Sequence, residues 1–197
     1  MTDEKDLIRR AGQGDGDAFR RLVEAYQAPV YRLALRMCGG DAALAEDAAQ
    51  EAFVAAWRGL PRFRGDSRFS TWLYRLTTNA AIDCLRREKR HRGADDLEDV
   101  DLPDGGDGPQ EAAERAETQN AVRRALALLS DEHRQVLLLR YMQELDYAEI
   151  AAALEISEGT VKSRISRAKI RLQALLSEGG NLSSAASVKT AGEEGQP

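Results

Sequence analysis

The sequence predicts an all-α protein of two small helical domains joined by an acidic flexible linker, the second domain containing a helix-turn-helix. Three observations support this fold class. Apolar residues recur at spacings of three and four in nearly every periodic segment, as they do along one face of a helix. A stretch rich in Asp, Gly and Pro interrupts this pattern in the middle of the chain. Near the carboxyl end, a short helical segment, a tight turn and a longer basic segment follow one another, which is the order of a helix-turn-helix.

The first domain is predicted at residues 18–92, after an amino-terminal extension at residues 1–17. Its first helix ends at Gly39 and Gly40, and Asp41 can cap the second helix by accepting bonds from its first backbone amides. The apolar face of the first helix comprises Phe19, Leu22, Val23, Tyr26, Val30, Leu33 and Ala34. The apolar stripe of the second helix comprises Leu44, Ala48, Ala52, Phe53 and Ala56, and the polar residues off this stripe are Asp47, Gln50 and Glu51.

A loop is predicted at residues 59–70, where Gly, Pro and an Asp-Ser pair punctuate the sequence. A third, long helix is expected from about Trp72 to Arg92, with Ser70 or Thr71 as its cap. Its last residues are mostly cations, which the dipole of a helix favours at that end. The apolar positions expected to face the core are Leu73, Leu76, Ala80, Leu85 and either Ile82 or the other neighbour of Asp83.

The acidic linker is predicted at residues 93–117, because this segment is rich in Gly, Pro and Asp and has no usable apolar period. A helix is expected to restart near Pro109. Beyond the second domain, residues 178–197 are expected to form a disordered tail, since Gly, Ser, Ala and Glu dominate there.

The second domain is predicted at residues 118–177. Ser130 is expected to cap one of its helices, and a short helix at residues 146–155 is followed by a tight turn at residues 156–159. The last helix packs inward through Val161, Ile165, Ala168 and Leu172. Its opposite face presents cationic and hydroxylic side chains: Lys162, Ser163, Ser166, Arg167 and Lys169. Such donors suit phosphate oxygens and guanine acceptors in a major groove, whereas the alternative is a helical hairpin with a basic surface.

Charge is unevenly distributed along a chain whose net charge is −5. Residues 58–92 carry ten Lys or Arg against three Asp or Glu, and residues 93–119 carry ten Asp or Glu against one Arg. Residues 160–173 carry five Lys or Arg and no acid. Basic patches are expected where phosphates must be neutralised, although a solvated helix face is the other meaning of such runs.

A second nucleic-acid signal lies in the segment that joins the loop to the third helix. Four aromatic residues alternate there with four arginines: Phe63, Phe69, Trp72 and Tyr74 with Arg62, Arg64, Arg68 and Arg75. Rings that stack on bases and cations that meet phosphates are typical of single-stranded DNA binding. The alternative is that half or more of these rings belong to the core, as we expect for Trp72.

Several classes of function are excluded by what the sequence lacks. Cys38 and Cys84 form no CxxC or zinc pattern and are expected to be reduced and partly buried. His91 and His133 have no nucleophile in a recognisable arrangement, and there is no phosphate loop, so no catalysis, cofactor, metal or small-molecule substrate is expected. The polar amino terminus and the lack of any run near 18 apolar residues favour a soluble, cytoplasmic protein.

Two runs of sequence carry a family resemblance. AEDAAQEAFVAAW (45–57) followed by FRGDSRFSTWLYRLTTNAAIDCLRREKR (63–90) resembles region 2 of the extracytoplasmic-function sigma factors of bacterial RNA polymerase. The run LSDEHRQVLLLRYMQELDYAEIAAALEISEGTVKSRISRAKIRLQALL (129–176) resembles their region 4. Both runs occur in the family's order. Departures are the alanines of DAAQEAF, and Ser166 where some members carry an aromatic residue.

The resemblance implies a protein that binds core RNA polymerase and promoter DNA, both as duplex and as melted strand, and that an anti-sigma protein holds. It places polymerase contacts at Asp47, Gln50 and Glu51. It places contacts with the −10 element at Phe63, Arg64, Asn79, Asp83, Arg86, Arg87, Lys89 and Arg90. It places contacts with the −35 duplex at Arg140, Lys162, Ser163, Ser166 and Arg167.

Two other functions compete with this interpretation. A stand-alone helix-turn-helix regulator would bind duplex DNA unaided and would use its amino-terminal helices for dimerisation or a ligand. A helical nucleic-acid enzyme would need a catalytic cluster, which the sequence lacks. The similarity over residues 45–90 argues against the regulator, since a ligand domain has no reason to share it.

Overall fold

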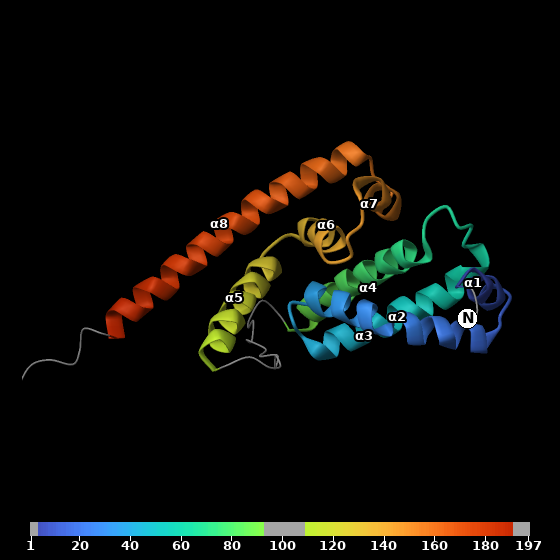
Figure 1. The fold of residues 1–197 in the computed structure, drawn as a ribbon, viewed down its shortest axis with the longest axis horizontal. Helices are drawn as coiled ribbons and strands as arrows, with labels where there is room; N and C mark the ends of the chain where they lie inside the picture. Colours follow the sequence, from blue (N-terminus) through green and yellow to red (C-terminus); the bar gives the residue numbers. More distant parts are fainter. Residues whose placement is uncertain (1–3, 93–108, 191–197) are drawn as a thin grey trace, which may run out of the picture.

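The computed structural model describes residues 4–92 and 109–190, and every regular element within them is helical, as the sequence predicts (Figure 1). The elements in chain order are α1 (Glu4–Gly12), α2 (Gly16–Met37), α3 (Ala42–Gly59), the 3-10 turn η1 (Leu60–Arg62), α4 (Phe69–Arg92), α5 (Pro109–Ala127), α6 (Asp131–Tyr141), α7 (Tyr147–Leu154) and α8 (Glu158–Thr190).

Helices α2, α3 and α4 pack against one another, and α1 contacts α2 and η1 at one end of this bundle (Figure 1). The core between them contains the fully buried side chains Leu22, Leu33, Met37 and Leu73. Each such side chain contributes roughly 1.5–3 kcal/mol through removal of apolar surface from water. The apolar faces of α2 and α3 therefore hold the bundle together, which leaves their polar faces for solvent or partners.

The end of α2 and the start of α3 are formed as the sequence predicts. Gly39 and Gly40 have φ angles of 71° and 101°, which residues with a Cβ rarely adopt. The Asp41 carboxylate then accepts a hydrogen bond of 3.0 Å from the backbone amide of Leu44. The two glycines thus allow a tight reversal, and the aspartate caps the helix that follows.

The start of α4 differs from the prediction. The helix begins at Phe69, so Ser70 and Thr71 lie within its first turn and neither is its cap. The Trp72 amide donates to the Arg68 carbonyl over 3.1 Å, which places the first helical bond two or three residues earlier than expected. Phe69 is buried among the rings beside it, and this packing favours the earlier start.

The buried face of α4 also differs from the prediction. Leu73 is buried as expected, but the expected Leu76, Ala80, Ile82 and Leu85 are only half-buried. The side chains that fill the other core positions are Tyr74, Thr77, Thr78, Ala81 and Cys84. The two threonine hydroxyls donate to carbonyls within the helix, at 2.9 Å and 3.1 Å, so their burial leaves these donors satisfied.

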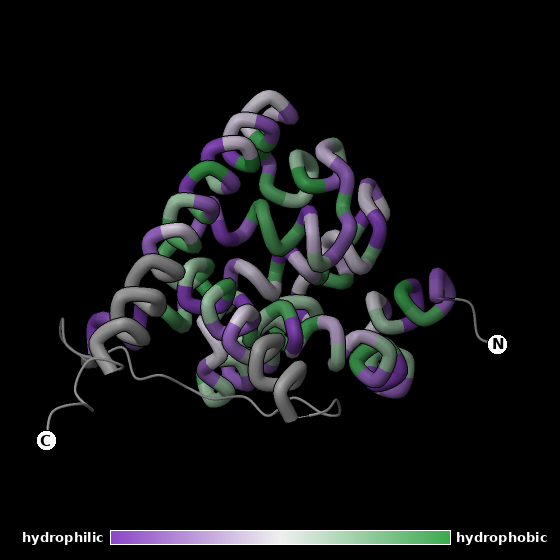
Figure 2. The backbone as a smooth tube through the Cα atoms, turned by 60° about the vertical axis from the view of Figure 1, so that its left-hand side comes forward, coloured by the Kyte–Doolittle hydropathy of each residue, from purple (hydrophilic) through white to green (hydrophobic). Residues whose placement is uncertain are grey.

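Helices α7 and α8 form the predicted helix-turn-helix, and α6 packs against both of them. The Ser130 side chain accepts a bond from the His133 amide at the start of α6, and Asp146 forms a capping box with Glu149 at the start of α7. Glu155 ends α7 in the left-handed conformation, with φ of 56°. Figure 2 shows hydrophilic and hydrophobic residues interleaved along α8, as expected of a helix with one face packed and one exposed.

Helices α5–α8 form the second half of the molecule. Its first and last helices have bounds that differ from those predicted from the sequence. Helix α5 begins at Pro109, where a restart is expected, so residues 109–117 of the predicted linker are helical and residues 93–108 lie outside the described part. Helix α8 continues to Thr190, well into the segment expected to be a tail. That segment contains no proline up to Thr190, so every residue can donate its amide to a helical bond.

The expectation for the cysteines is confirmed: Cys38 and Cys84 are both buried free thiols. Burial raises the pKa of Cys38 to about 12, which keeps it protonated and unreactive near neutral pH. Over residues 4–92 and 109–190, no helix is long and apolar enough to cross a membrane. No metal-binding group of three or more His, Cys, Asp or Glu occurs in the same ranges.

Candidate nucleic-acid interface

The outer face of α3 carries the first group of predicted site residues. Asp47 and Gln50 are exposed, and Glu51 is half-buried. The side chains of α3 that face the core are the small residues Ala45, Ala48, Ala52 and Ala56. Val54 and Trp57 add exposed apolar surface to this helix, which the sequence pattern did not indicate. Helix α3 therefore presents acidic, amide and apolar groups together.

Glu51 is paired with a residue that the sequence assigned to a different surface. Its carboxylate accepts a hydrogen bond of 2.5 Å from Nη2 of Arg87 on α4, and the same nitrogen lies 3.0 Å from Sγ of Cys84. The bond with Glu51 is the main reason that the pKa of Arg87 is raised. Arg87 is thus held at the seam between α3 and α4.

The aromatic residues of the 63–72 segment form a cluster. The Phe63 and Trp72 rings lie 4.9 Å apart, and Phe69 lies 5.3 Å from Tyr26 of α2 in an edge-to-face arrangement. Phe69 is buried and the other three rings are half-buried. The cluster therefore belongs largely to the core, as the alternative interpretation expected. The neighbouring side chains Arg62, Arg64 and Arg68 are exposed.

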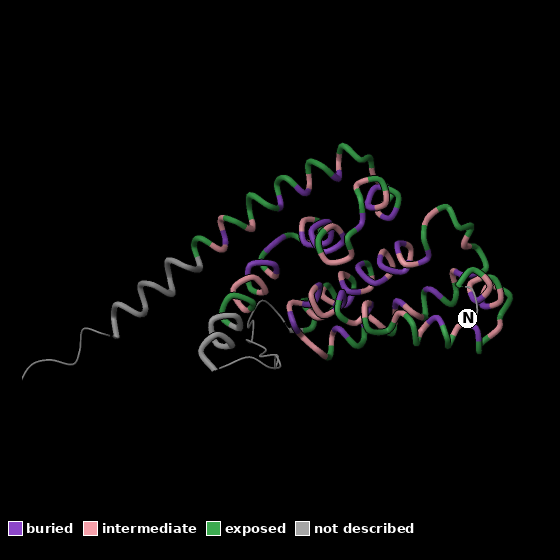
Figure 3. The backbone as a smooth tube through the Cα atoms, viewed as in Figure 1, coloured by how far each residue is buried: buried purple, intermediate pink, exposed green. Residues whose placement is uncertain are grey.

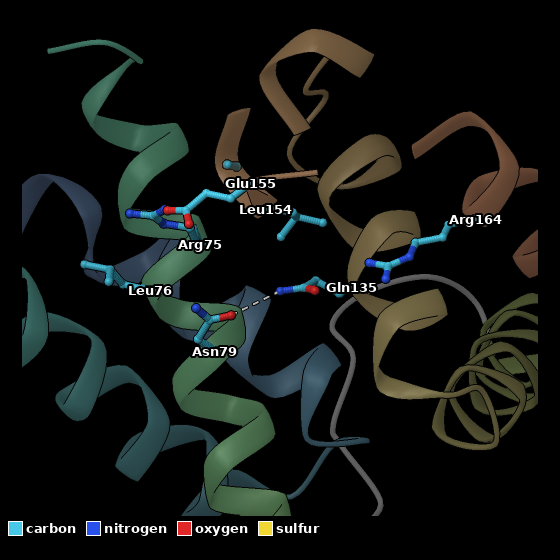
Figure 4. A pocket seen from close by; sticks show the side chains of 8 residues that line it. Arg75, Leu76, Asn79, Gln135, Leu154, Glu155 and Arg164 are labelled. Atoms are coloured by element: carbon cyan, nitrogen blue, oxygen red, sulfur yellow. Dashed lines mark hydrogen bonds and ion pairs between the residues drawn. The ribbon is translucent and has the colours of Figure 1, made fainter. Parts of the chain in front are cut away.

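Asn79 projects from α4 towards the second half of the molecule (Figure 4). Its Oδ1 accepts a bond of 3.4 Å from Nε2 of Gln135 on α6, drawn as a dashed line. A hollow of about 350 Å³ lies between the two halves here, lined by Arg75, Leu76, Asn79, Gln135, Ala153, Leu154, Glu155 and Arg164. Arg75 is bonded to Glu155 across it. The face of α4 that carries Asn79 is thus partly covered by α6 and α7.

Two residues outside the sequence-based predictions hold this contact. The Gln135 side chain is buried and donates 2.7 Å to the Thr78 hydroxyl of α4. The buried Arg134 guanidinium donates 2.6 Å to the Met37 carbonyl of α2. The sequence contained one indication of these contacts. An adjacent Arg and Gln immediately precede the apolar run VLLL on a helix, so polar side chains border a segment that is expected to be buried. Figure 3 shows buried positions on the facing sides of α4 and α6.

The remaining predicted −10 residues lie towards the carboxyl end of α4. Asp83, Arg86, Lys89 and Arg90 are all exposed. Arg86 lies 3.9 Å from the Asp83 carboxylate and 4.0 Å from that of Asp131 on α6. The cationic surface therefore continues along α4 beyond Asn79.

The predicted −35 residues lie together on the helix-turn-helix. Lys162, Ser163, Ser166 and Arg167 are exposed on one face of α8, whereas Val161, Ile165 and Ala168 are buried on the other. Arg140 is half-buried at the end of α6 and donates 2.8 Å to the Leu145 carbonyl. The donors predicted to meet duplex DNA thus share one surface.

Comparison with known proteins gives two family matches in the same order. The model of sigma-70 region 2 matches residues 22–91, and that of sigma-70 region 4 matches residues 119–172. Among solved structures, CnrH in complex with the cytosolic domain of CnrY is 27% identical, with a TM-score of 0.64, and covers 89% of this chain and 97% of that one. The sigma factor RpoE in complex with the anti-sigma factor NepR from Bartonella quintana is 25% identical, with a TM-score of 0.65, and covers 81% and 96%.

Curated relatives agree with these matches. The RNA polymerase sigma-H factor of Pseudomonas aeruginosa is 38% identical over 179 residues, which is 86% of this chain and 92% of the relative. The ECF RNA polymerase sigma factor SigW of Bacillus subtilis is 37% identical over 179 residues, which is 86% of this chain and 94% of the relative. These findings confirm the resemblance stated from the sequence. The chain belongs to the sigma-70 family as an extracytoplasmic-function RNA polymerase sigma factor, a non-enzymatic protein that directs transcription initiation.

Proposed function

We propose that this sigma factor divides its work between two units, residues 18–92 and residues 118–177, joined by the acidic linker. The first unit binds core RNA polymerase and the melted promoter strand, and the second reads the upstream duplex. The observation that carries this proposal is the exposed cationic and hydroxylic face of α8 in the same chain as the basic face of α4. Each face suits one physical form of DNA.

Polymerase binding is assigned to the outer face of α3. Asp47 and Gln50 are exposed and lie opposite the alanines that pack on the core, so they are available without disturbing the fold. Glu51 contributes together with Arg87, its partner on α4. This one helix face presents acidic, amide and apolar groups together, which is the mixture that a protein partner can bind through both polar and apolar contacts.

Contact with the −10 element is assigned to α4 and to the segment before it. Asn79 offers both a donor and an acceptor to the edge of an unpaired base. Phe63, Arg64 and the cations Arg86, Lys89 and Arg90 surround the path of the strand; Asp83 and Arg87 complete the assigned group. Extruding a base requires unstacking, and contacts with such a pocket recover part of that energy.

Contact with the −35 duplex is assigned to Arg140, Lys162, Ser163, Ser166 and Arg167. In a helix-turn-helix the second helix enters the major groove, and here that helix is α8. The exposure of its four assigned residues and the burial of Val161 and Ile165 on the other side support this orientation.

The linker and the cellular setting follow from the same proposal. Residues 93–119 carry ten acids against one Arg, so their negative charge screens the basic faces from stray nucleic acid. The protein acts in the cytoplasm, where core polymerase works. An anti-sigma protein is its inhibitor, by analogy with the similar RpoE, which was solved in complex with the anti-sigma factor NepR.

Run-off transcription with core polymerase tests the proposal against the regulator alternative. Addition of this chain is expected to produce initiation at promoters that core polymerase alone does not use. A variant with Asn79→Ala is expected to bind core polymerase normally yet form fewer open complexes. If the chain binds duplex DNA without polymerase and does not change the transcripts that core polymerase makes, the result would support the stand-alone regulator instead.

A further inference from the structure

Two cations from different helices meet on one aromatic ring of the helix-turn-helix. The guanidinium carbon of Arg140 lies 5.3 Å from the centre of the Tyr147 ring, and Nζ of Lys162 lies 5.8 Å from the same centre. Both lie within the range of about 6 Å in which a cation is attracted to a ring face. Arg140 comes from α6, Tyr147 from α7 and Lys162 from α8, so one ring joins both helices of the motif to α6.

The ring itself is fixed by the start of its helix. Tyr147 is the first residue of α7, directly after the capping aspartate. The Glu149 amide donates 2.7 Å to the Asp146 carboxylate, and the Asp146 amide donates 3.0 Å to the Glu149 carboxylate. Tyr147 is half-buried and packs against the core of the motif. Arg140 is held in addition by its bond to the Leu145 carbonyl.

We propose that Tyr147 is a positioning residue, whose ring holds Arg140 and Lys162 together as a two-cation clamp for duplex phosphates. This inference rests on the proposed function, in which both cations contact the upstream duplex. The electron-rich ring attracts both positive charges and so favours their location in one region of the surface. The ring also restricts two long side chains before DNA arrives, so less conformational entropy is lost when the complex forms.

In this proposal the aromatic ring of Tyr147 positions the two cations, and its phenolic hydroxyl does not. Substitutions that keep or remove the ring therefore test it. Tyr147→Phe retains the ring face, whereas Tyr147→Leu removes it and keeps an apolar side chain for packing. Tyr147→Met offers a second ring-free variant with a more adaptable side chain, should the leucine variant melt at a lower temperature than the parent.

The test is titration of the full chain with a short duplex of random sequence at several salt concentrations, with thermal unfolding of each variant. Tyr147→Leu and Tyr147→Met are expected to bind about 5- to 30-fold more weakly, because both variants lack the two cation–π interactions. Tyr147→Phe is expected to restore the affinity. Equal weakening by Phe and Leu would overturn the proposal, because the hydroxyl would then be the functional group.

A double-mutant cycle separates positioning from a structural role. In a background with Arg140→Ala and Lys162→Ala, adding Tyr147→Leu is expected to weaken binding no further. A further decrease of the same size in that background would overturn the proposal, since the ring would then act without the cations. If the background variant itself binds like the parent, the two DNA contacts of the proposed function are wrong. If it binds weakly while Tyr147→Leu binds normally, only the positioning role is wrong.

Discussion

Arg134 shows how a single buried cation can tie the second half of this sigma factor to the first. Its guanidinium donates to the carbonyls of Leu126, Ala127 and Leu129, near the end of α5, and to that of Met37, the last residue of α2. Carbonyls at the ends of helices have no partner within the helix and carry partial negative charge. Burial lowers the pKa of Arg134, but these acceptors compensate its charge.

Replacing Arg134 is therefore expected to destabilise the fold substantially. Arg134→Met keeps most of the packing and removes every donor, so four carbonyls lose their bond to the guanidinium, and of these Leu126 keeps a bond from the Leu129 amide. We expect the free energy of unfolding to fall by about 3 kcal/mol, and Arg134→Lys to recover part of it through one ammonium. Urea unfolding followed by circular dichroism measures both. A decrease below about 1 kcal/mol for the methionine variant would show that water replaces the guanidinium at these carbonyls.

Asp47 and Gln50 are expected to behave in the opposite way, with an effect on binding and little on stability. The variant with Asp47→Ala and Gln50→Ala changes only exposed groups, so its stability should stay within about 0.5 kcal/mol of the parent. Its affinity for core polymerase should fall. The matched control carries Glu24→Ala and Gln27→Ala, which remove an acid and an amide from the exposed face of α2. Similar affinity of the two variants for core polymerase would contradict the assignment of α3.

At the scale of elements, local chemistry determined what could be predicted. Asp41 and Ser130 were correctly placed as caps, because a cap depends on neighbours in the sequence. The turn predicted at residues 156–159 overlaps the helix that follows, since α8 begins at Glu158. The buried stripe of α4 was not correctly predicted, because Thr77 and Thr78 are polar residues that a hydrophobic pattern leaves out. Their hydroxyls donate to carbonyls within the helix, so both can be buried. Pairs such as Glu51 with Arg87 join different helices, and no sequence spacing indicates them.

Helix α8, which is proposed to contact the upstream duplex, offers a prediction at this scale. Lys162→Ala with Arg167→Ala removes two exposed cations from α8 and leaves its buried face unchanged. Each phosphate contact removed should reduce the salt slope of upstream-duplex binding by roughly one, whereas removal of a base contact should cost about 1–3 kcal/mol at one sequence position. Fluorescence anisotropy with the polymerase-bound chain measures both quantities. If the salt slope and the affinity are both unchanged, the assignment of α8 to the DNA interface is wrong.

At the scale of the whole molecule, the two halves are packed in an arrangement that covers part of the Asn79 face of α4, although the Asn79 side chain remains exposed. The contact is made by Gln135 with Thr78, by Arg75 with Glu155 and by Arg134 with the end of α2. The strand proposed to bind this face would meet the α6–α7 corner beside it. The same packing explains why one hydrophobic cluster extends from α2 and α4 into α6 and α8. The proposed binding of a strand at Asn79 would therefore compete with its hydrogen bond to Gln135, and separation of the halves would release that bond.

Gln135→Glu is expected to separate the two halves, although the Glu side chain has almost the same shape as the Gln side chain that it replaces. The amide nitrogen of Gln135 faces oxygen atoms of Thr78 and Asn79, so a carboxylate there would meet acceptors in a buried position. Burying that charge should cost the closed form about 1–3 kcal/mol, which shifts the balance towards the open form by about 5- to 150-fold. Small-angle scattering should then give a larger radius of gyration than for the parent. The control is Gln173→Glu, the same change at an exposed position of α8.

The pH dependence of this variant distinguishes opening from unfolding. Burial raises the pKa of a carboxyl, so the closed form binds a proton more tightly than the open form does. Lowering the pH through that raised pKa neutralises the group, which can then donate to Thr78 or Asn79, and the closed form should regain its population. The radius of gyration of the Gln135→Glu protein is thus expected to fall towards that of the parent as the pH falls. An expansion that persists at low pH, or that Gln173→Glu shows equally, would mean that Gln135 does not hold the two halves together.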